Sequence, residues 1–366
     1  MKNTFGNAVS LTLAGESHGD AITVILDGLS AGVKVDTTEI DRELARRRPS
    51  GASDTARREA DKYSIVSGVF EGYTTGTPIC IVIPNESKKS DDYKALCGVA
   101  RPSHADYAAH CKYHGFEDYR GGGHFSGRVT VGLVAAGAIL QSALRGVGIE
   151  IGTHIAKCAG VSDRGFENVK EDIASLKSAS FPLLDGAREG AMMDAIVAAK
   201  KEGDSVGGVV ETCVLGMPAG VGEPWFDSVE GLLSHAIFSL GGVKGVEFGD
   251  GFALSDMRGS EANDPFRMEN GNVYTLTNRN GGVNGGITNG MPLVFRCAVK
   301  PTPSIAKPQQ SVNFAEGKEI DLSTHGRHDP AIVRRICPVI DSVTALVLCD
   351  LLTLRFGEDY LAGAKK

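Results

Sequence analysis

Apolar runs rich in β-branched residues alternate with amphipathic segments along most of the chain. Runs of this kind, bounded by glycine, proline and polar turns, predict β-strands. Two polar interruptions stand out, a loop over about 85–100 and a region over about 162–188. The predicted strands are residues 7–13, 21–27, 63–70, 78–84, 148–161, 209–220 and 291–299, with weaker strand signals at 246–254 and 273–277.

Five segments have the spacing of helices. The first starts with Asp36 and Glu39, an Asp-x-x-Glu pair close to a capping box, and stops at Pro49, because the residue before a proline avoids helical geometry. The last follows Pro330 and contains Pro338, which predicts an interruption. The predicted helices cover residues 39–48, 129–144, 191–203, 230–240 and 331–356.

A strand–turn–helix pattern occurs twice. Residues 23–32 (TVILDGLSAG) and 209–220 (VVETCVLGMPAG) both predict a strand that ends in a Gly-x-x-Ala-Gly turn, and an Asp-x-x-Glu helix start follows each. A supersecondary unit used twice predicts a duplicated core, with chance similarity as the alternative. The predicted halves are roughly residues 1–150 and 200–366 of a single domain that covers residues 1–366.

The composition is that of a soluble globular protein. Of the 366 residues, 42% are hydrophobic and 23% are charged. The apolar runs are far shorter than the roughly 20 residues that span a bilayer, and the N-terminus has no apolar signal-peptide core. The eight cysteines are scattered without a Cys-x-x-Cys pair, which argues against structural zinc and is typical of reduced core thiols. We therefore expect a cytoplasmic protein that does not bind a membrane.

The net charge of −7 argues against a nucleic-acid partner that is attracted by a global positive field. The positive charge is local instead, at Arg46–Arg48, at Arg57–Arg58 and within residues 101–128. Arginine clusters in an acidic protein suit a small anionic ligand. Glycine is the compositional outlier, with 47 residues that often occur in pairs, which predicts loops whose backbone approaches other groups closely.

Residues 101–128 form the most polar stretch, with four histidines and the triple glycine Gly121–Gly123. Backbone N–H groups beside arginines can bind an anion, and a solvated basic loop is the alternative. His110 and His114 have helical spacing and lie beside Cys111, but they lack a further well-placed ligand. No metal site is therefore assigned.

Three further segments can carry chemistry. The GESHG turn places His18 between glycines, which suits a general acid near neutral pH, although a surface turn is the alternative. Residues 277–290 (TNRNGGVNGGITNG) can form an anion nest to which Lys300 adds charge, or a pair of long turns. The GRHDP segment places Asp329 before a proline, where it can also cap a helix.

Standard nucleotide motifs are absent from the sequence. It has no Gly-x-Gly-x-x-Gly at a strand–helix junction, no P-loop and no nucleophile elbow. These absences argue against an oxidoreductase with net hydride transfer from a nicotinamide, the main alternative among enzymes. A non-catalytic anion- or RNA-binding module is the second alternative, and it leaves His18, His104 and Asp329 without a task.

Together these segments resemble the chorismate synthase family over nearly the whole chain. The matching stretches include GESHG, ARRRPS, SGVFEGYTTGTPI, RPSHADY, DYRGGG, KKEGDSVGG, PAGVGEP, GVEFGDGF, KPTPSI and RHDP. The resemblance implies an α+β fold with duplicated halves, which form a four-layer β/α/α/β sandwich with long glycine-rich loops, and a homotetramer. It also implies a carbon–oxygen lyase of the shikimate pathway and aromatic amino acid biosynthesis, which eliminates phosphate from 5-enolpyruvylshikimate 3-phosphate to give chorismate.

The implied 1,4-elimination needs reduced FMN without net redox change. Because no reductase domain is evident in the sequence, we expect an external flavin reductant. The implied FMN contacts are Ser126, Gly241, Gly242, Gly285, Lys300, Pro301, Thr302, Pro303, Ser304 and Arg327.

The resemblance implies roles in catalysis and substrate binding as well. His18 would protonate the departing phosphate, and His104 would lie beside the N1 and O2 side of the reduced flavin. Asp329, through Ser17, would accept the proton at flavin N5. A substrate with a phosphate and two carboxylates needs several cations. The implied substrate contacts are Arg46, Arg47, Arg128 and Arg327, and Arg47 would also contact NADP.

Three positions depart from the family pattern. Many members read Arg-Ser-Ser-Ala-Arg where this chain has HFSGR at 124–128, so the second serine and the last arginine are kept and the first arginine is lost. Gly241–Gly242 replaces an Asn-Ala pair, and Ser53 stands where the family has arginine. Because the implied proton-transfer residues are all present, we expect activity, with altered flavin contacts at residues 124–125 and 241–242.

Overall fold

Two large antiparallel sheets form the frame of the molecule. The computed structural model describes residues 3–50, 54, 60–86, 96–324 and 329–362. The first sheet has the strand order β1 (Thr4–Phe5), β2 (Ser10–Ala14), β3 (Ala21–Asp27), β7 (Ile79–Pro84), β4 (Ser64–Ser67). The second has the order β10 (Val161–Ser162), β9 (Glu150–Cys158), β11 (Gly208–Leu215), β17 (Leu293–Val299), β12 (Val243–Phe248).

The two sheets repeat one chain path. In spatial order, β2, β3, β7 and β4 of the first sheet correspond to β9, β11, β17 and β12 of the second. Helix α1 (Thr37–Arg47) follows β3 as α6 (Val229–Ile237) follows β11, and a long helix ends each path, α3 (Thr130–Gly146) and α8 (Val333–Phe356). The second path begins at β9, whereas the sequence pattern placed it near residue 200. The excursion through α4 (Val169–Leu176) and α5 (Glu189–Lys201) separates β9 from β11 and hid this start.

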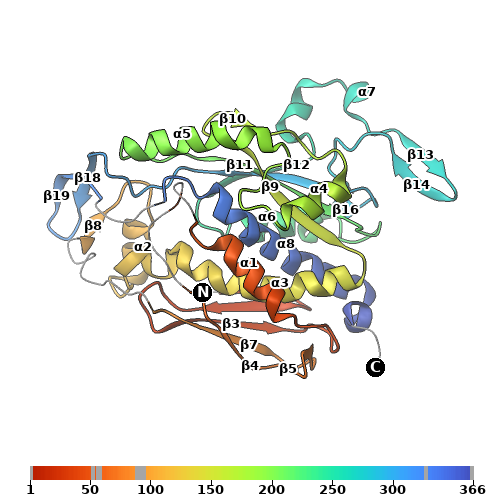
Figure 1. Cartoon of the computed structure of the whole chain (residues 1–366), viewed down its shortest axis with the longest axis horizontal. Coiled ribbons are helices and arrows are strands. Elements are labelled where there is room, and N and C mark those ends of the chain that lie inside the picture. Colours follow the sequence, from red (N-terminus) through yellow and green to blue (C-terminus); the bar gives the residue numbers. More distant parts are fainter. Residues whose placement is uncertain (1–2, 51–53, 55–59, 87–95, 325–328, 363–366) are drawn as a thin grey trace.

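The long helices lie between the sheets (Figure 1). Helix α3 contacts β3 and β7 as well as α8, and α8 contacts β9 and β11. Helix α4 also packs on β9 and β11, and Figure 1 shows α5 beyond the second sheet. The burial patterns agree with this arrangement, because β3 alternates between buried and more exposed positions while β9 has an unbroken buried run from Ile151 to Ile155.

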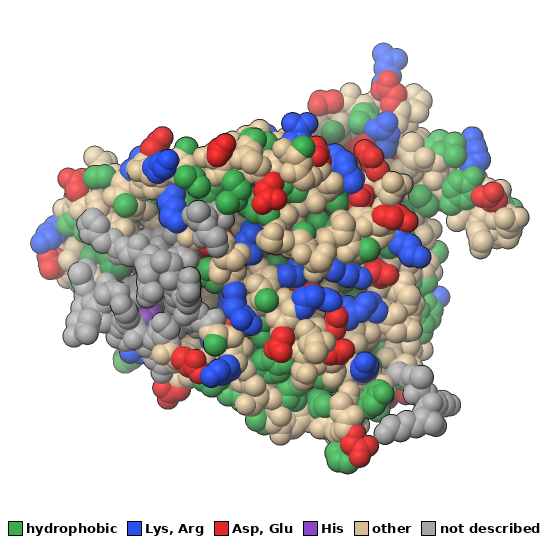
Figure 2. Space-filling model, viewed as in Figure 1, with side chains coloured by type: hydrophobic (Ala, Val, Ile, Leu, Met, Phe, Trp, Pro, Cys, Tyr) green, Lys and Arg blue, Asp and Glu red, His purple; other side chains and the backbone are tan. Residues whose placement is uncertain are grey.

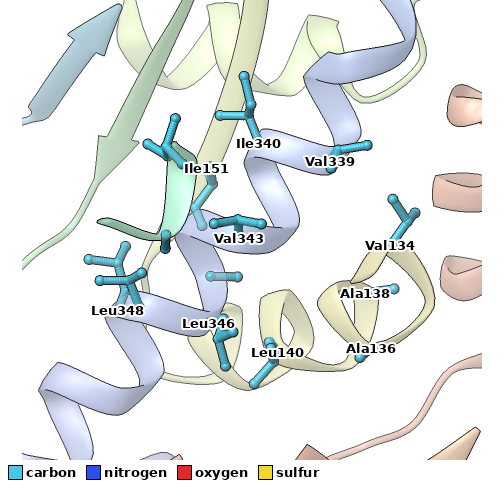
Figure 3. Close-up of a cluster of buried hydrophobic side chains, with 14 of the residues drawn as sticks. Val134, Ala136, Ala138, Leu140, Ile151, Val339, Ile340, Val343, Leu346 and Leu348 are labelled. Carbon is cyan, nitrogen blue, oxygen red and sulfur yellow. The ribbon is translucent and has the colours of Figure 1, made fainter. Parts of the chain in front are cut away.

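Helices α3 and α8 pack closely in the centre of the core. Val134, Ala138 and Leu140 of α3 lie near the side chains of α8, including Val343 and Leu346 (Figure 3). The helices lie close together at Gly137, where a methyl group would lie 2.2 Å from Ser342 Cβ. Small residues at the crossing therefore set the spacing of the two helices.

Helix α8 continues through Pro338, and the predicted interruption is wrong. Proline removes one backbone donor, and burial of the helix on all sides outweighs that loss. By length and composition, Gly127–Gly146 and Val333–Phe356 could each cross a membrane, but their most apolar windows are 78% and 100% buried in the fold. Helices that are buried to this extent belong to the core of the fold.

Shorter elements complete the described part of the chain. Helix α2 (Asp106–Tyr113) lies in the histidine-rich stretch and α4 in the polar region, and neither was predicted, because each has only 8 residues, too few to establish a clear helical period. The remaining elements are α7 (Gly259–Ala262), β5 (Val69–Phe70), β6 (Tyr73–Thr74), β8 (Val99–Ala100), β13 (Phe266–Glu269), β14 (Asn272–Thr275), β15 (Val283–Asn284), β16 (Ile287–Thr288), β18 (Gln309–Asn313) and β19 (Lys318–Leu322).

Candidate active site

The candidate site lies where α3 and α8 begin. Arg47, at the end of α1, donates from Nη1 to the carbonyl of Gly127 at 3.4 Å, just before α3. Arg335, in the first turn of α8, donates from Nε to the carbonyl of Arg47 at 2.8 Å. Two helix N-termini thus meet beside one arginine, and helix N-termini favour negative charge. Figure 1 shows α2, β8, β18 and β19 together at this end of the molecule.

The triple glycine Gly121–Gly123 runs between two histidines. A methyl group at Gly121 would lie 2.5 Å from His18 Cε1, and one at Gly122 would lie 3.2 Å from His104 Cε1. All three glycines have positive φ, at 59°, 82° and 53°. Only glycine combines that backbone geometry with such close approach. The triple glycine therefore lets the His18 and His104 rings approach two adjacent residues of one backbone segment.

The GESHG turn is held from several directions. Asn85 Nδ2 donates to the carbonyls of Glu16 and Gly19 at 3.0 and 2.9 Å. His124 Nδ1 lies 2.7 Å from the carbonyl of Gly15, and this bond uses the residue that replaces the family arginine. These contacts fix the turn that carries Ser17 and His18, both of which are buried.

Ser17 has a buried hydroxyl that can bind a ligand. Its backbone N–H donates to the carbonyl of Gly123 at 3.0 Å, so the main chain is anchored to the triple glycine. Its Oγ has no hydrogen-bond partner among the described residues. A buried hydroxyl is normally hydrogen-bonded, so a polar ligand would satisfy this one.

His104 is in contact with a carboxylate that the sequence did not single out. Its Nδ1 lies 2.8 Å from Asp106 Oδ1. Burial raises the pKa of Asp106, but hydrogen bonds from Arg101 and His104 outweigh burial and hold the pKa well below its usual range. The sequence does carry a signal for this pair, because Asp106 lies only two residues after His104, at the start of α2.

Three arginines surround one buried carboxylate. Asp61 forms ion pairs with Arg47 at 3.1 Å, with Arg48 at 3.7 Å and with Arg128. Burial lowers the pKa of Arg47 to about 10 against the effect of Asp61, and the neighbouring Arg335 and Arg128 add to the lowering. Three guanidinium groups gathered around one carboxylate, beside two helix N-termini, favour a small anionic ligand here. Asp61 was missed because a single carboxylate carries no pattern, whereas Arg48 belongs to the arginine cluster of the sequence but was not among the implied substrate contacts.

Arg46 does not join this cluster. Its Nη1 donates to Glu43 at 2.6 Å and to Asp341 of α8 at 3.1 Å. Burial lowers the pKa of Arg46, but the carboxylates of Glu43 and Asp341 outweigh it and raise the pKa. The structure therefore places Arg46 in an ion-pair network between α1 and α8 and not beside Arg47 and Arg128.

Most of the implied FMN contacts come together from separate segments. Lys300 Nζ donates to the carbonyl of Ser103 at 2.5 Å, and Arg101 Nη1 donates to Ser304 Oγ at 3.4 Å, so the segment after β17 lies beside His104. Burial and the nearby Lys244 lower the pKa of Lys300.

Glycine and serine positions join the same region. The carbonyl of Gly242 accepts from the backbone N–H of Lys300 at 2.9 Å, and a methyl group at Gly241 would lie 3.9 Å from the carbonyl oxygen of Phe125. Ser126 Oγ accepts from the backbone N–H of Arg128 at 3.3 Å. Thr302 Oγ1 is buried without a hydrogen-bond partner in the described part of the chain. Pro301 packs on Gly207, and Pro303 connects Thr302 to the buried Ser304.

Gly285 lies apart from these contacts within one chain. It occupies the β15–β16 turn, and the neighbouring Gly281 and Gly282 pack on backbone atoms at the start of β17. Lys300 follows the end of the same seven-residue strand, about 23 Å further along. The predicted anion nest of the glycine loop with Lys300 is therefore wrong for a single chain, and Figure 1 shows β16 at the opposite end of the molecule from α2.

Asp329 is an ion-pair partner of Arg335 and not a helix cap. The N-cap position of α8 is Ile332, and the Asp329 carboxylate accepts from Arg335 Nη1. Through Arg335 it is linked to the carbonyl of Arg47. The implied contact at Arg327 lies outside the described residues.

No metal site is evident among the described residues, where no group of three or more His, Cys, Asp or Glu side chains could hold an ion. His110, one of the sequence candidates, lies 3.2 Å from Glu117 and packs against Phe314. It therefore belongs to the packing of α2.

The comparisons with known proteins agree with one another and cover nearly the whole chain. A family model described as chorismate synthase matches residues 9–353. A chorismate synthase of Pyrococcus abyssi is 45% identical over 350 residues, covering 96% of this chain and 97% of the relative, and one of Dehalococcoides mccartyi (strain BAV1) is 44% identical over 360 residues, covering 98% of each. A solved structure titled "Crystal Structure of Chorismate Synthase" is similar with a TM-score of 0.75 at 27% identity, covering 96% of this chain and 94% of that one.

Proposed function

The chain belongs to the chorismate synthase family and is a lyase of that kind, and we propose that the site at the start of α3 and α8 is where it acts. The proposed reaction is the 1,4-elimination of phosphate from 5-enolpyruvylshikimate 3-phosphate. The observation that carries this placement is the passage of Gly121–Gly123 between His18 and His104. This brings two proton carriers to a region of excess positive charge.

The arginine cluster is suited to bind the substrate. Arg47, Arg48 and Arg128 gather around Asp61, and clustered guanidinium groups are suited to a ligand that carries a phosphate and carboxylates. The N-termini of α3 and α8 add to that field. The implied NADP contact falls on the same Arg47 guanidinium, so a nucleotide and the substrate would compete for it.

His18 is proposed to protonate the departing phosphate. It is 5% exposed and its ring lies against the Gly121 backbone, so water is largely excluded from it. A buried, oriented donor stabilises a leaving group better than bulk water does. Asp329 and Ser17 are proposed to accept the proton that the reaction releases, and Ser17 Oγ is the buried hydroxyl that a ligand would satisfy.

The residues present fit FMN. Ser17 Oγ and Thr302 Oγ1 are buried hydroxyls without partners among the described residues. Lys300, two residues before Thr302, adds a positive charge. Reduced FMN, when bound, supplies the electron density that makes loss of phosphate possible. The chain's own part is to orient the substrate, hold its charges and exclude water. The residues proposed to hold FMN are Ser126, Gly241, Gly242, Lys300, Pro301, Thr302, Pro303 and Ser304. An external reductant is proposed to supply the reduced flavin.

The finer architecture is also a proposal. The contacts of α3 with β3 and β7, and of α8 with β9 and β11, support a four-layer β/α/α/β arrangement of duplicated halves in one domain. Exposed apolar side chains on the β13–β14 hairpin, including Phe266, Met268 and Val273, support assembly into a homotetramer. The eight free cysteines, most of them buried, are typical of a cytoplasmic protein.

Anaerobic turnover tests the proposed function. The purified protein is mixed with dithionite-reduced FMN and 5-enolpyruvylshikimate 3-phosphate, and chorismate absorbance should rise as phosphate is released. Absence of turnover with reduced flavin would contradict the proposal. Consumption of NADPH in proportion to product would favour a flavin oxidoreductase. An RNA-binding module is disfavoured by the face in Figure 2, where Lys and Arg side chains are interspersed with Asp and Glu.

A further inference from the structure

The carboxylate of Asp106 is held rigidly by its neighbours. Arg101 Nε donates to Oδ2 at 2.8 Å and Arg101 Nη2 to Oδ1 at 2.7 Å, which is the bidentate geometry of a strong arginine–carboxylate pair. The backbone N–H of Arg101 adds a bond to Oδ2 at 3.0 Å. Arg101 is 6% exposed, so solvent does not compete for this pair.

These contacts decide which ring nitrogen of His104 carries a proton. Nδ1 lies 2.8 Å from Asp106 Oδ1 and 3.1 Å from Arg101 Nη2. If Nδ1 were unprotonated, its lone pair would lie 2.8 Å from a carboxylate oxygen, and two hydrogen-bond acceptors would repel each other. Ionised Asp106 only accepts hydrogen bonds, and Arg101 already donates to the same oxygen, so Nδ1 is a donor to Asp106.

The opposite edge of the ring faces the triple glycine. A methyl group at Gly122 would lie 3.3 Å from His104 Nε2 and 3.2 Å from Cε1. Nε2 is thus the nitrogen on the side where Gly121 approaches His18 and Ser17. With Nδ1 committed to Asp106, Nε2 is the ring nitrogen that faces the site.

We propose that Asp106 is the positioning residue of His104, fixing the ring so that Nδ1 keeps its proton and Nε2 faces the site. This inference rests on the proposed function and adds a residue to it. A carboxylate behind a histidine orients the ring and stabilises its protonated form without itself taking the proton. Among the described residues, the other charged or titratable groups that printed contacts place near His104 are Arg101, Lys300 beside Ser103, and His18 at the triple glycine. Asp106 is the anion in this described set.

The first test compares two substitutions of the same kind. Asp106→Asn keeps the shape and offers an amide N–H to Nδ1, which favours the wrong tautomer. We expect kcat to fall by about 10²- to 10⁴-fold, the range of general acid–base contributions, with little change in FMN affinity. Asp106→Glu should recover part of the loss. Asp172→Asn is the matched control, because Asp172 is also buried and paired twice with an arginine, Arg164, at 3.0 and 2.6 Å.

The second test asks whether Asp106 acts through His104. In a His104→Gln background, Asp106→Asn should cost no further activity, because residues that act as a unit are not additive. Additive losses, an unchanged kcat in Asp106→Asn, or a loss matched by Asp172→Asn would each overturn the proposal.

The third test does not depend on turnover. In protein labelled with ¹⁵N-histidine, the neutral His104 ring, assigned by its disappearance in His104→Gln, should show a protonated Nδ1 and an unprotonated Nε2. Asp106→Asn should reverse or average this pattern. An unchanged pattern would refute the role of Asp106. Wild-type protein that makes no chorismate, yet shows the expected pattern, would instead refute the proposed function.

Discussion

Gly121 and Gly122 show how single residues build the site. Any side chain at Gly121 would collide with the His18 ring, and any side chain at Gly122 would press on the His104 ring. Both positions also have positive φ, so a substitution would strain the backbone as well. The spacing of the two histidines therefore depends on residues that have no side chain of their own.

Replacement of His18 by alanine removes the proposed proton donor. Because the ring packs on Gly121 and the proposed FMN contacts come from other segments, we expect kcat to fall about 10²- to 10⁴-fold with FMN affinity nearly unchanged. Asp329→Asn should behave in the same way. Stopped-flow turnover and anaerobic FMN titration measure the two quantities. His110→Ala is the control, and equal losses of activity and flavin affinity would make His18 and Asp329 structural.

Replacement of Arg47 by glutamine should weaken substrate binding. The guanidinium is buried between Asp61 and two other arginines, so its charge acts at low dielectric. We expect kcat/KM to fall about 10- to 100-fold, mostly through KM, as hydrogen bonds to charged groups predict. Arg42→Gln, on the same helix and paired with Glu39, should leave steady-state kinetics unchanged. Equal kinetics of the two variants would remove Arg47 from the substrate site.

At the residue scale, the sequence indicates the histidines of the candidate site more clearly than it indicates the ion pairs. His18 and the triple glycine are visible because glycine-flanked polar residues stand out from a globular background. The role of Asp61 and the direction of the Arg46 side chain are not visible, because they depend on which charges meet after folding. Three adjacent arginines look alike in sequence, yet Arg46 and Arg47 leave α1 toward different partners.

At the scale of elements, the end of α1 is closed by the beginning of α8. Arg334 donates to the carbonyls of Arg46 and Arg48 at 3.1 and 2.6 Å, and Arg335 donates to that of Arg47. These are the last carbonyls of α1, which a helix leaves without partners of its own. Guanidinium groups from the second chain path thus cap a helix of the first, which couples the two paths at the site.

The crossing of α3 and α8 predicts a sharp difference between two glycines. Gly137→Ala would place a methyl group 2.2 Å from Ser342 Cβ, so we expect a loss of about 1–3 kcal/mol in the free energy of unfolding. Gly190→Ala, in the first turn of α5 with open space around it, should be neutral or stabilising by up to about 1 kcal/mol. Urea unfolding measures both. Similar stabilities would contradict the described crossing.

The ion-pair network between α1 and α8 predicts a dependence of stability on pH. Burial raises the pKa of Asp341 to about 6, and Glu43 competes with it for Arg46. A carboxyl whose pKa is raised on folding stabilises the protein below its unfolded pKa, near 4, and that stability is lost as pH rises through 6.

Comparison with Asp341→Asn isolates this contribution. The free energy of unfolding of the wild type, minus that of the variant, should fall between pH 4 and pH 7 by up to about 3 kcal/mol. Chemical unfolding of both proteins at each pH measures the difference. A difference that stays constant over this range would mean that Asp341 titrates as it does in the unfolded chain.

At the scale of the whole molecule, the periodicity of apolar residues predicted the positions of strands and helices best. Strands with alternating or continuous apolar runs and helices with strong caps were located within a few residues, as for β3 and α1. The boundary between the two halves was not located, because two helices separate β9, where the second path starts, from β11. The remote position of Gly285 also follows from strand length and pairing, which single-sequence patterns do not specify.

The most direct test of the central claim is the redox balance of the reaction. With limiting reduced FMN under anaerobic conditions, chorismate, phosphate and the flavin spectrum are followed together. We predict equal amounts of chorismate and phosphate, many turnovers per flavin, and a flavin that stays reduced at the end. Flavin oxidation in proportion to product, or phosphate release without chorismate, would contradict the account.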